Sequence, residues 1–172
     1  RDRFLYPAQF YAHKNHKYLI EVAANIKDKT EKEFLFIFTG IDKGNLSYLK
    51  KITNEHNLNN KIKFFENLEN EYLIKIYLLC DAVISSTYIG KLSLPLLEAF
   101  YFKKPIFYSK NILDSDIEKR TNIFDLKNVD DLSNQLVSFM NDKENLSKNL
   151  RENREFYDLN CSSTKFAKTY QT

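Results

Sequence analysis

The chain has 172 residues, a length that fits one domain, and 43% of them are hydrophobic, enough for a core that needs no disulfide or metal. Its net charge of +3 is spread over 26 basic and 23 acidic side chains, which argues against nucleic-acid binding but suits an anionic ligand or an anionic membrane surface. Two cysteines without C-x-x-C spacing predict neither a zinc site nor a disulfide framework, and no apolar run approaches the length of a membrane span. We therefore expect a soluble, cytoplasmic domain, and because the chain starts at Arg1 we expect it to be part of a longer protein.

Short apolar runs alternate with longer helical patterns along the sequence. In chain order we expect a strand at 3–8, a helix at 15–26, a strand at 34–39, a helix at 45–56, a strand at 61–65, a helix at 69–79, a strand at 81–86, a helix at 95–102, a strand at 104–108, a short strand at 122–125, and helices at 130–140, 143–156 and 162–170. Repeated strand–helix units predict an α/β fold, a Rossmann-like, doubly wound parallel sheet of about six strands with helices on both faces, in a single domain over residues 1–172.

Ligands of such sheets bind outside the carboxyl ends of the strands, where loops lead into helix N-termini. This rule directs attention to four places in the sequence. They are the loop 9–15, the turn at Gly40, the loop after Phe65, and the stretch 88–97.

Two segments carry a more specific pattern. Residues 6–16 read YPAQFYAHKNH, and residues 93–100 read SLPLLEAF, a few positions before Lys103-Lys104-Pro105. In this order and separation they resemble the C-terminal, donor-binding domain of family 4 glycosyltransferases (glycosyl transferases group 1), retaining enzymes with the GT-B fold. Residues 38–40 and 81–86 are similar to two further strands of that domain, so the resemblance extends from about Phe4 to Tyr170.

The resemblance implies a domain that binds a UDP- or GDP-sugar for retaining, hexosyltransferase-type transfer to a saccharide or lipid-linked acceptor. It implies bacterial surface polysaccharide synthesis, of capsule or lipopolysaccharide, at the inner face of the membrane, with no metal and no other cofactor. It also implies an N-terminal GT-B domain, absent from this chain, that binds the acceptor and carries a catalytic His. The isolated domain is then expected to be inactive.

Lys14 and the helix that opens at residues 94–97 are the predicted diphosphate site. A helix N-terminus offers unpaired N–H groups and the positive end of a dipole, and a Lys in the first turn of a helix adds a mobile point charge. We expect Lys14 at such a position, and we expect the backbone amides from Leu94, Pro95, Leu96 and Leu97 to face the same anion. The alternative for Lys14 is an ordinary solvated side chain at a helix start.

Glu98 is an acid in an otherwise apolar helix, so its carboxylate needs hydrogen-bond donors. The resemblance implies that ribose hydroxyls supply them, and the alternative is a core salt bridge. The resemblance also places the nucleobase near Phe65 and Leu68, where core packing explains the apolar side chains equally well. His13 and His16 are interpreted as structural or loop residues.

Two positions depart from the family pattern. The family carries a first glutamate eight positions before the one at Glu98, and this chain has Gly90 there, followed by Lys91-Leu92-Ser93 in place of Gly-Phe-Gly. Gln9 stands where many members have an Arg that faces the diphosphate. These departures keep two other hypotheses open, a degenerate, non-catalytic nucleotide-sugar-binding domain and a GT-B nucleotide-sugar epimerase.

Overall fold

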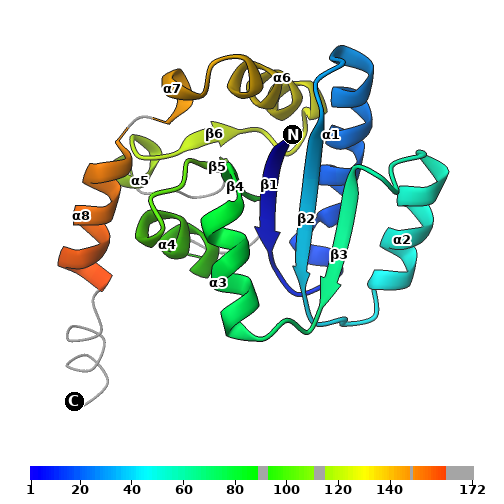
Figure 1. Ribbon diagram of the computed structural model, residues 1–172, viewed down its shortest axis with the longest axis horizontal. Coiled ribbons are helices and arrows are strands. Elements are labelled where there is room, and N and C mark those ends of the chain that lie inside the picture. The colour runs from blue at the N-terminus through cyan, green and yellow to red at the C-terminus, as the bar shows by residue number, and fades with distance from the viewer. Residues whose placement is uncertain (89–92, 111–114, 148, 162–172) are drawn as a thin grey trace.

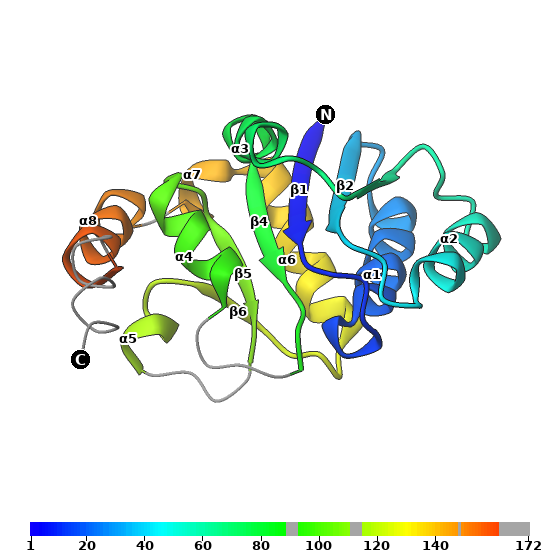
Figure 2. The same cartoon turned by 90° about the horizontal axis from the view of Figure 1, so that it is seen from below.

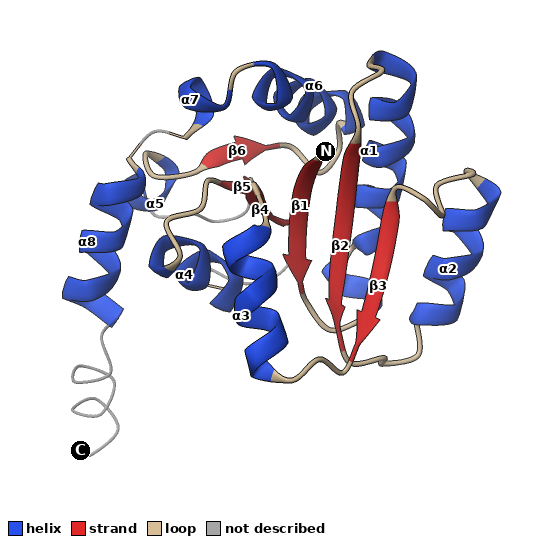
Figure 3. Cartoon of the chain, viewed as in Figure 1, coloured by secondary structure: helices blue, strands red, loops and turns tan. Residues whose placement is uncertain are grey.

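The computed structural model describes residues 1–88, 93–110, 115–147 and 149–161. These residues form one parallel sheet of six strands in the order β3-β2-β1-β4-β5-β6 (Figures 1 and 3). The strands are β1 (Asp2–Pro7), β2 (Phe34–Gly40), β3 (Ile62–Glu66), β4 (Ala82–Ser85), β5 (Ile106–Ser109) and β6 (Asn122–Phe124). The helices are η1 (Ala12–Lys14), α1 (His16–Lys29), α2 (Leu46–Glu55), α3 (Asn70–Leu79), α4 (Leu94–Tyr101), α5 (Ser115–Glu118), α6 (Val129–Asn141), α7 (Lys143–Leu146) and α8 (Leu150–Cys161). The predicted Rossmann-like fold is confirmed.

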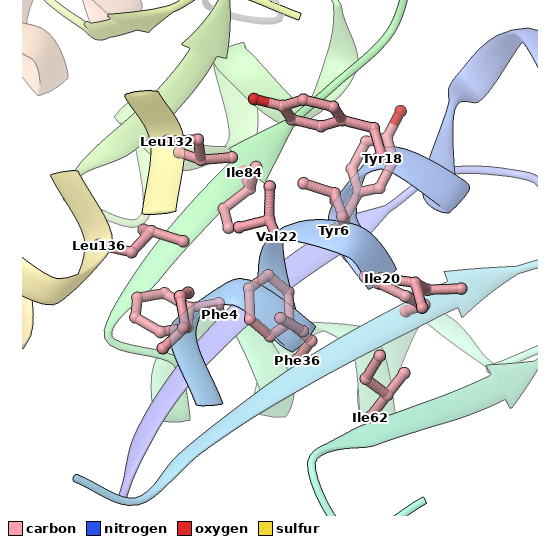
Figure 4. Close-up of a cluster of buried hydrophobic side chains, with 14 of the residues drawn as sticks. Phe4, Tyr6, Tyr18, Ile20, Val22, Phe36, Ile62, Ile84, Leu132 and Leu136 are labelled. Carbon is pink, nitrogen blue, oxygen red and sulfur yellow. The ribbon is translucent and has the colours of Figure 1, made fainter. Parts of the chain in front are cut away.

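The sheet is covered by helices on both faces because its strands alternate two sets of apolar side chains. On β1, Phe4 and Tyr6 point into a core shared with α1 and α6, whereas Leu5 points into a second core shared with α3 and α4 (Figures 1 and 2). Figure 4 shows the first core, in which Phe4 and Phe36 of the sheet meet Val22 of α1. Full burial of one such aromatic side chain contributes about 2–3 kcal/mol.

Three helical regions differ from the sequence expectation, among them the short helix η1, which was not predicted. The predicted helix 143–156 is wrong as one element, because Asn149 adopts a left-handed conformation (φ 64°) between α7 and α8 and so interrupts the right-handed helix. The four-residue helix α5 was not predicted. The helix expected at 162–170 lies outside the described residues. No helix in the described ranges is long and apolar enough to cross a membrane.

His16, the first residue of α1, is fully buried among aromatic rings. Its ring centroid lies 4.7 Å from that of Tyr6, 5.0 Å from that of Phe10 and 5.3 Å from that of Phe38. Burial lowers the pKa of His16 to about 3, and the nearby Lys14 ammonium acts in the same direction. The imidazole is therefore neutral and structural in the folded protein, as the sequence interpretation held.

We expect His16 to make the fold sensitive to mild acid. Because the unfolded chain binds a proton near pH 6.5 and the folded chain only near pH 3, stability is complete above pH 6.5 and is lost as the pH falls below it. The loss between pH 7.5 and pH 5 is about 2 kcal/mol in the free energy of unfolding. Urea unfolding at both pH values measures it. His16→Phe should remove the difference and His56→Gln, at an exposed His, should keep it; an unchanged difference in His16→Phe would contradict the assignment.

Candidate functional site

Two adjoining cavities lie at the carboxyl ends of β1, β2 and β4, where the strand order reverses between β1 and β4. The smaller, about 340 Å³, is lined by Pro7, Ala8, Gln9, Thr39, Gly40, Ile41, Asn67, Leu68, Asn70, Leu73, Leu94, Pro95 and Glu98. The larger, about 540 Å³, is lined by Tyr6, Pro7, Ala8, Gln9, Tyr11, His13, Lys14, Ser85, Thr87, Ser93, Leu94 and Pro95. We call the pair the carboxyl-end cleft, because the two cavities share the segment 7–9 and residues 94–95.

Gly40 allows the floor of this cleft to form. Beyond the end of β1, the chain stays against β2: Ala8 donates its N–H to the Thr39 carbonyl (2.9 Å). A Cβ at Gly40 would lie 2.8 Å from both the Ala8 carbonyl carbon and the Gln9 Cα, and closer still to the Ala8 oxygen. Gly40 lines the smaller cavity, and the contact that requires a glycine there is this backbone approach.

We expect Gly40→Ala to lower the free energy of unfolding by about 2 kcal/mol or more, because the obstructing atoms belong to backbone and cannot rotate away. Gly44→Asn is the control: Gly44 has φ 91° with no heavy atom within 4 Å of a Cβ, and Asn tolerates positive φ best among residues with side chains. Chemical unfolding measures both variants. Equal stability of Gly40→Ala and the parent would show that the backbone contact does not constrain this position.

Lys14 ends the short helix η1 and lies before α1, which corrects the expected place in the first turn of a long helix. Asn15 follows in a left-handed conformation (φ 57°), and α1 starts at His16. The Lys14 carbonyl accepts hydrogen bonds from the Tyr6 hydroxyl (2.8 Å) and the Ser86 hydroxyl (3.2 Å). Lys14 lines the larger cavity, and among the described residues its side chain has no ion-pair partner.

The first turn of α4 offers fewer free amides than the sequence suggested. Pro95 has no N–H, and the N–H groups of Leu96 and Leu97 both donate to the Ser93 carbonyl, at 3.1 and 3.3 Å. The expectation that these two amides face an anion is therefore wrong: they close the first helical turn on its capping residue. Leu96 is fully buried in the second core, and Leu97 is outside the lining of the cleft.

Glu98 is half-buried and lines the smaller cavity. Its Oε2 accepts a hydrogen bond of 2.5 Å from the hydroxyl of Tyr77 on α3. Burial, together with the Glu98 carboxylate, raises the pKa of Tyr77 far above its ordinary value, so the phenol stays protonated and keeps donating. Among the described residues Glu98 has this hydroxyl as partner and no ion pair of the kind the alternative interpretation required.

The other predicted site residues divide into three groups. Gln9, Leu68, Leu94 and Pro95 line the cleft with Lys14, Gly40 and Glu98. Phe65 does not line it and is 40% exposed on β3. Gly90 and Lys91 lie outside the described residues.

Sequence reasoning missed several polar side chains of the cleft. Asn67 lines it from the loop between β3 and α3, Asn70 lines it as the first residue of α3, and Thr87 lines it after β4. The rule that ligands bind at the carboxyl ends of parallel strands directed attention to the loop after Phe65 and to the stretch 88–97, which starts next to Thr87. The rule does not identify which side chains face the cleft, because that depends on loop conformations such as the left-handed conformation of Asn67 (φ 55°).

The sequence pattern of a known family matches most of the chain, residues 1–155, and this family is described as Glycosyl transferases group 1. The chain belongs to this family. No curated protein sequence matches this chain.

Solved structures agree with this membership at the level of the fold. The C-terminal domain of the glycosyl transferase group 1 family protein LpcC from Francisella tularensis has a TM-score of 0.73 at 15% identity, over 90% of this chain and 83% of that one. A glycosyltransferase from Rickettsia africae has a TM-score of 0.81 at 19% identity, over 99% of this chain and 46% of that one. HepE from Anabaena, solved in complex with UDP and glucose, has a TM-score of 0.81 at 14% identity, over 98% and 48%. This chain thus spans about half the length of the last two, and its fold is that of GT-B glycosyltransferase domains.

Proposed function

We propose that this domain binds the nucleoside-diphosphate sugar of a retaining glycosyltransferase, with Lys14 at the diphosphate and Glu98 at the ribose. The observation that carries the proposal is the carboxyl-end cleft itself. Lys14 lines one of its cavities, Glu98 lines the other, and the segment 7–9 forms a wall of both. A nucleotide that extends across this shared wall meets a cation and a carboxylate at separate points.

Lys14 suits the diphosphate because its ammonium is not already neutralised by a described acid. Its backbone is fixed by Tyr6 and Ser86, so the side chain starts from a defined place while its long stem can follow a leaving group. In transfer, the diphosphate leaves the sugar and gains negative charge, and a cation positioned there lowers the barrier. In this proposal the Lys14 ammonium stabilises the charge of the diphosphate, and no metal ion is needed for that.

Glu98 suits the ribose because a carboxylate accepts several hydrogen bonds and Tyr77 uses only Oε2. The Tyr77 hydroxyl holds the carboxylate in place, and the remaining lone pairs can take the hydroxyls of a ribose diol. Ile41 and Leu68 line the same cavity and offer apolar contacts to a base. HepE, which shares this fold, has been solved with UDP and with UDP-glucose, so uridine nucleotides are the first ligands to test.

The finer parts of the proposal concern the whole protein. A second GT-B domain holds a saccharide or lipid-linked acceptor and supplies the catalytic His, so this chain binds a hexosyl donor without transferring it. The reaction serves surface polysaccharide synthesis at the cytoplasmic face of a membrane. Transfer by this chain alone would contradict that division of labour.

We expect Lys14→Ala to weaken UDP binding at least tenfold, since a charge-assisted hydrogen bond contributes about 1.5–3 kcal/mol. Calorimetric titration of UDP, GDP and ADP into the parent and the variant measures the effect. Uridine, which has no phosphate, should bind both proteins equally. Lys17→Ala is the matched control, because Lys17 is the second residue of α1, pairs with Glu21 (3.7 Å) and does not line the cleft. Unchanged UDP affinity in Lys14→Ala would defeat the phosphate assignment.

Glu98→Gln should weaken UDP binding about fivefold and leave the affinity for 2′,3′-dideoxy-UDP unchanged, because only UDP has the hydroxyls that a carboxylate prefers. Tyr77→Phe should lower the affinity for UDP less, since it frees the carboxylate without removing it. The same calorimetric titrations give the coupling between side chain and ribose. Equal losses for both nucleotides in Glu98→Gln would place the ribose elsewhere.

The sequence at Gly90 supports a second candidate, a domain that binds a nucleotide sugar and never transfers it. A full-length protein that binds donor without hydrolysis or transfer would favour that function. Sugar turnover without any acceptor would instead favour a nucleotide-sugar epimerase.

A further inference from the structure

The loop that carries Lys14 has little support from its own sequence. Helix η1 has three residues, and Asn15 follows it in a left-handed conformation (φ 57°). Among the described residues, no side chain caps the N-terminus of η1 or that of α1. The Lys14 N–H donates to the Tyr11 carbonyl at 3.2 Å, which closes a single turn. A fixed position for Lys14 therefore depends on contacts from more distant parts of the chain.

Ser86 supplies such a contact from the loop that follows β4. Its side chain is fully buried, and its Oγ lies 3.2 Å from the carbonyl oxygens of both Lys14 and Asn15, so the two carbonyls share one hydroxyl proton. The hydroxyl of Tyr6 donates to the same Lys14 carbonyl at 2.8 Å, which a carbonyl with two lone pairs allows. Burial raises the pKa of Tyr6 well above its ordinary value, so this phenol stays protonated and keeps donating.

The segment around Ser86 is itself anchored on two sides. The carbonyl of Thr87 accepts a hydrogen bond from the hydroxyl of Ser109 on β5 at 2.9 Å. The N–H of Tyr88 donates to the carbonyl of His13 at 3.3 Å, which adds a second link to the loop of Lys14. The loops after β1 and β4 are thus joined to each other, and the second of them is joined to β5.

Ser86 does not line either cavity of the carboxyl-end cleft, although Ser85 and Thr87 on both sides of it do. Its buried hydroxyl therefore faces the backbone of the Lys14 loop and not a ligand. Any effect of Ser86 on binding has to pass through that backbone. A lysine whose backbone is already fixed loses less conformational freedom when a ligand binds, and this raises affinity.

We propose that Ser86 is a positioning residue for the diphosphate, which holds the loop of Lys14 in place and does not touch the nucleotide. The inference rests on the proposed function, because it requires the Lys14 ammonium at the diphosphate. It adds that the phosphate part of the affinity depends on a hydroxyl from the opposite loop of the cleft.

The test is a double-mutant cycle by calorimetric titration of UDP and uridine into the parent, Ser86→Ala, Lys14→Ala and the double variant. We expect Ser86→Ala to weaken UDP binding about fivefold, since one hydrogen bond is lost, and to leave uridine binding unchanged. In the Lys14→Ala background, Ser86→Ala should cause no further loss, because the lysine through which it acts is absent.

Two further variants separate positioning from a general effect on the fold. Ser133→Ala is the matched control: Ser133 is fully buried on α6, its hydroxyl donates to the Val129 carbonyl at 2.7 Å, and it lies outside the cleft lining. It should leave UDP affinity unchanged. Tyr6→Phe keeps the buried ring and removes the other hydroxyl from the Lys14 carbonyl, so it should weaken UDP binding and spare uridine.

Each result decides between the two proposals. A loss of UDP affinity in Lys14→Ala without one in Ser86→Ala or Tyr6→Phe would overturn the positioning role alone. The same would follow from equal losses for UDP and uridine in Ser86→Ala, or from a full further loss in the double variant. Unchanged UDP affinity in Lys14→Ala would overturn the proposed phosphate site and this inference with it.

Discussion

The reversal of strand order between β1 and β4 is the constraint on which the rest of this structure depends. Connections on the two sides of that point run to opposite faces of the sheet, so the loops after β1 and β4 separate and leave the carboxyl-end cleft. Hydrogen bonds then hold the separated loops in place. The hydroxyl of Ser86, just past β4, donates to the carbonyls of Lys14 and Asn15, and the hydroxyl of Tyr6 on β1 donates to the same Lys14 carbonyl. The backbone of Lys14 is thus held by residues on or just past the two central strands.

Much of the fold could be predicted from the sequence because its signals are local. The apolar run at β2 and the strand–helix alternation required only periodicity, and they gave the correct fold class. The break at Asn149 could not be predicted, because nothing in the neighbouring residues distinguishes it from a helical Asn; its amide donates to the Lys119 carbonyl, 30 residues away. Local sequence patterns therefore predict which helices and strands form, whereas long-range contacts determine where some of them end.

The candidate site, like the fold, could be predicted from the sequence only in part. The general rule for parallel sheets pointed to this end of the sheet, and Lys14 and Glu98 line the cleft there. Tyr77 lies in the helix predicted at 69–79 and its ring is buried, but the partner of its hydroxyl lies on another helix. Likewise, the amides of Leu96 and Leu97 were expected to be free, whereas the capping geometry of α4 engages them. The partners of side-chain hydroxyls and of helix-cap amides depend on the detailed geometry of the folded chain, which sequence patterns do not encode.

The bond from Ser86 to Lys14 also has a consequence for how the protein is made. The two residues are 72 positions apart, so during synthesis the loop that carries Lys14 leaves the ribosome long before the residue that anchors it. Helix α1 and the β1–β2 pair can form early from nearby sequence, but the cleft cannot take its final shape until β4 has been translated and inserted beside β1. A nascent chain released before that point would carry Lys14 without the hydroxyl of Ser86 that holds its carbonyl.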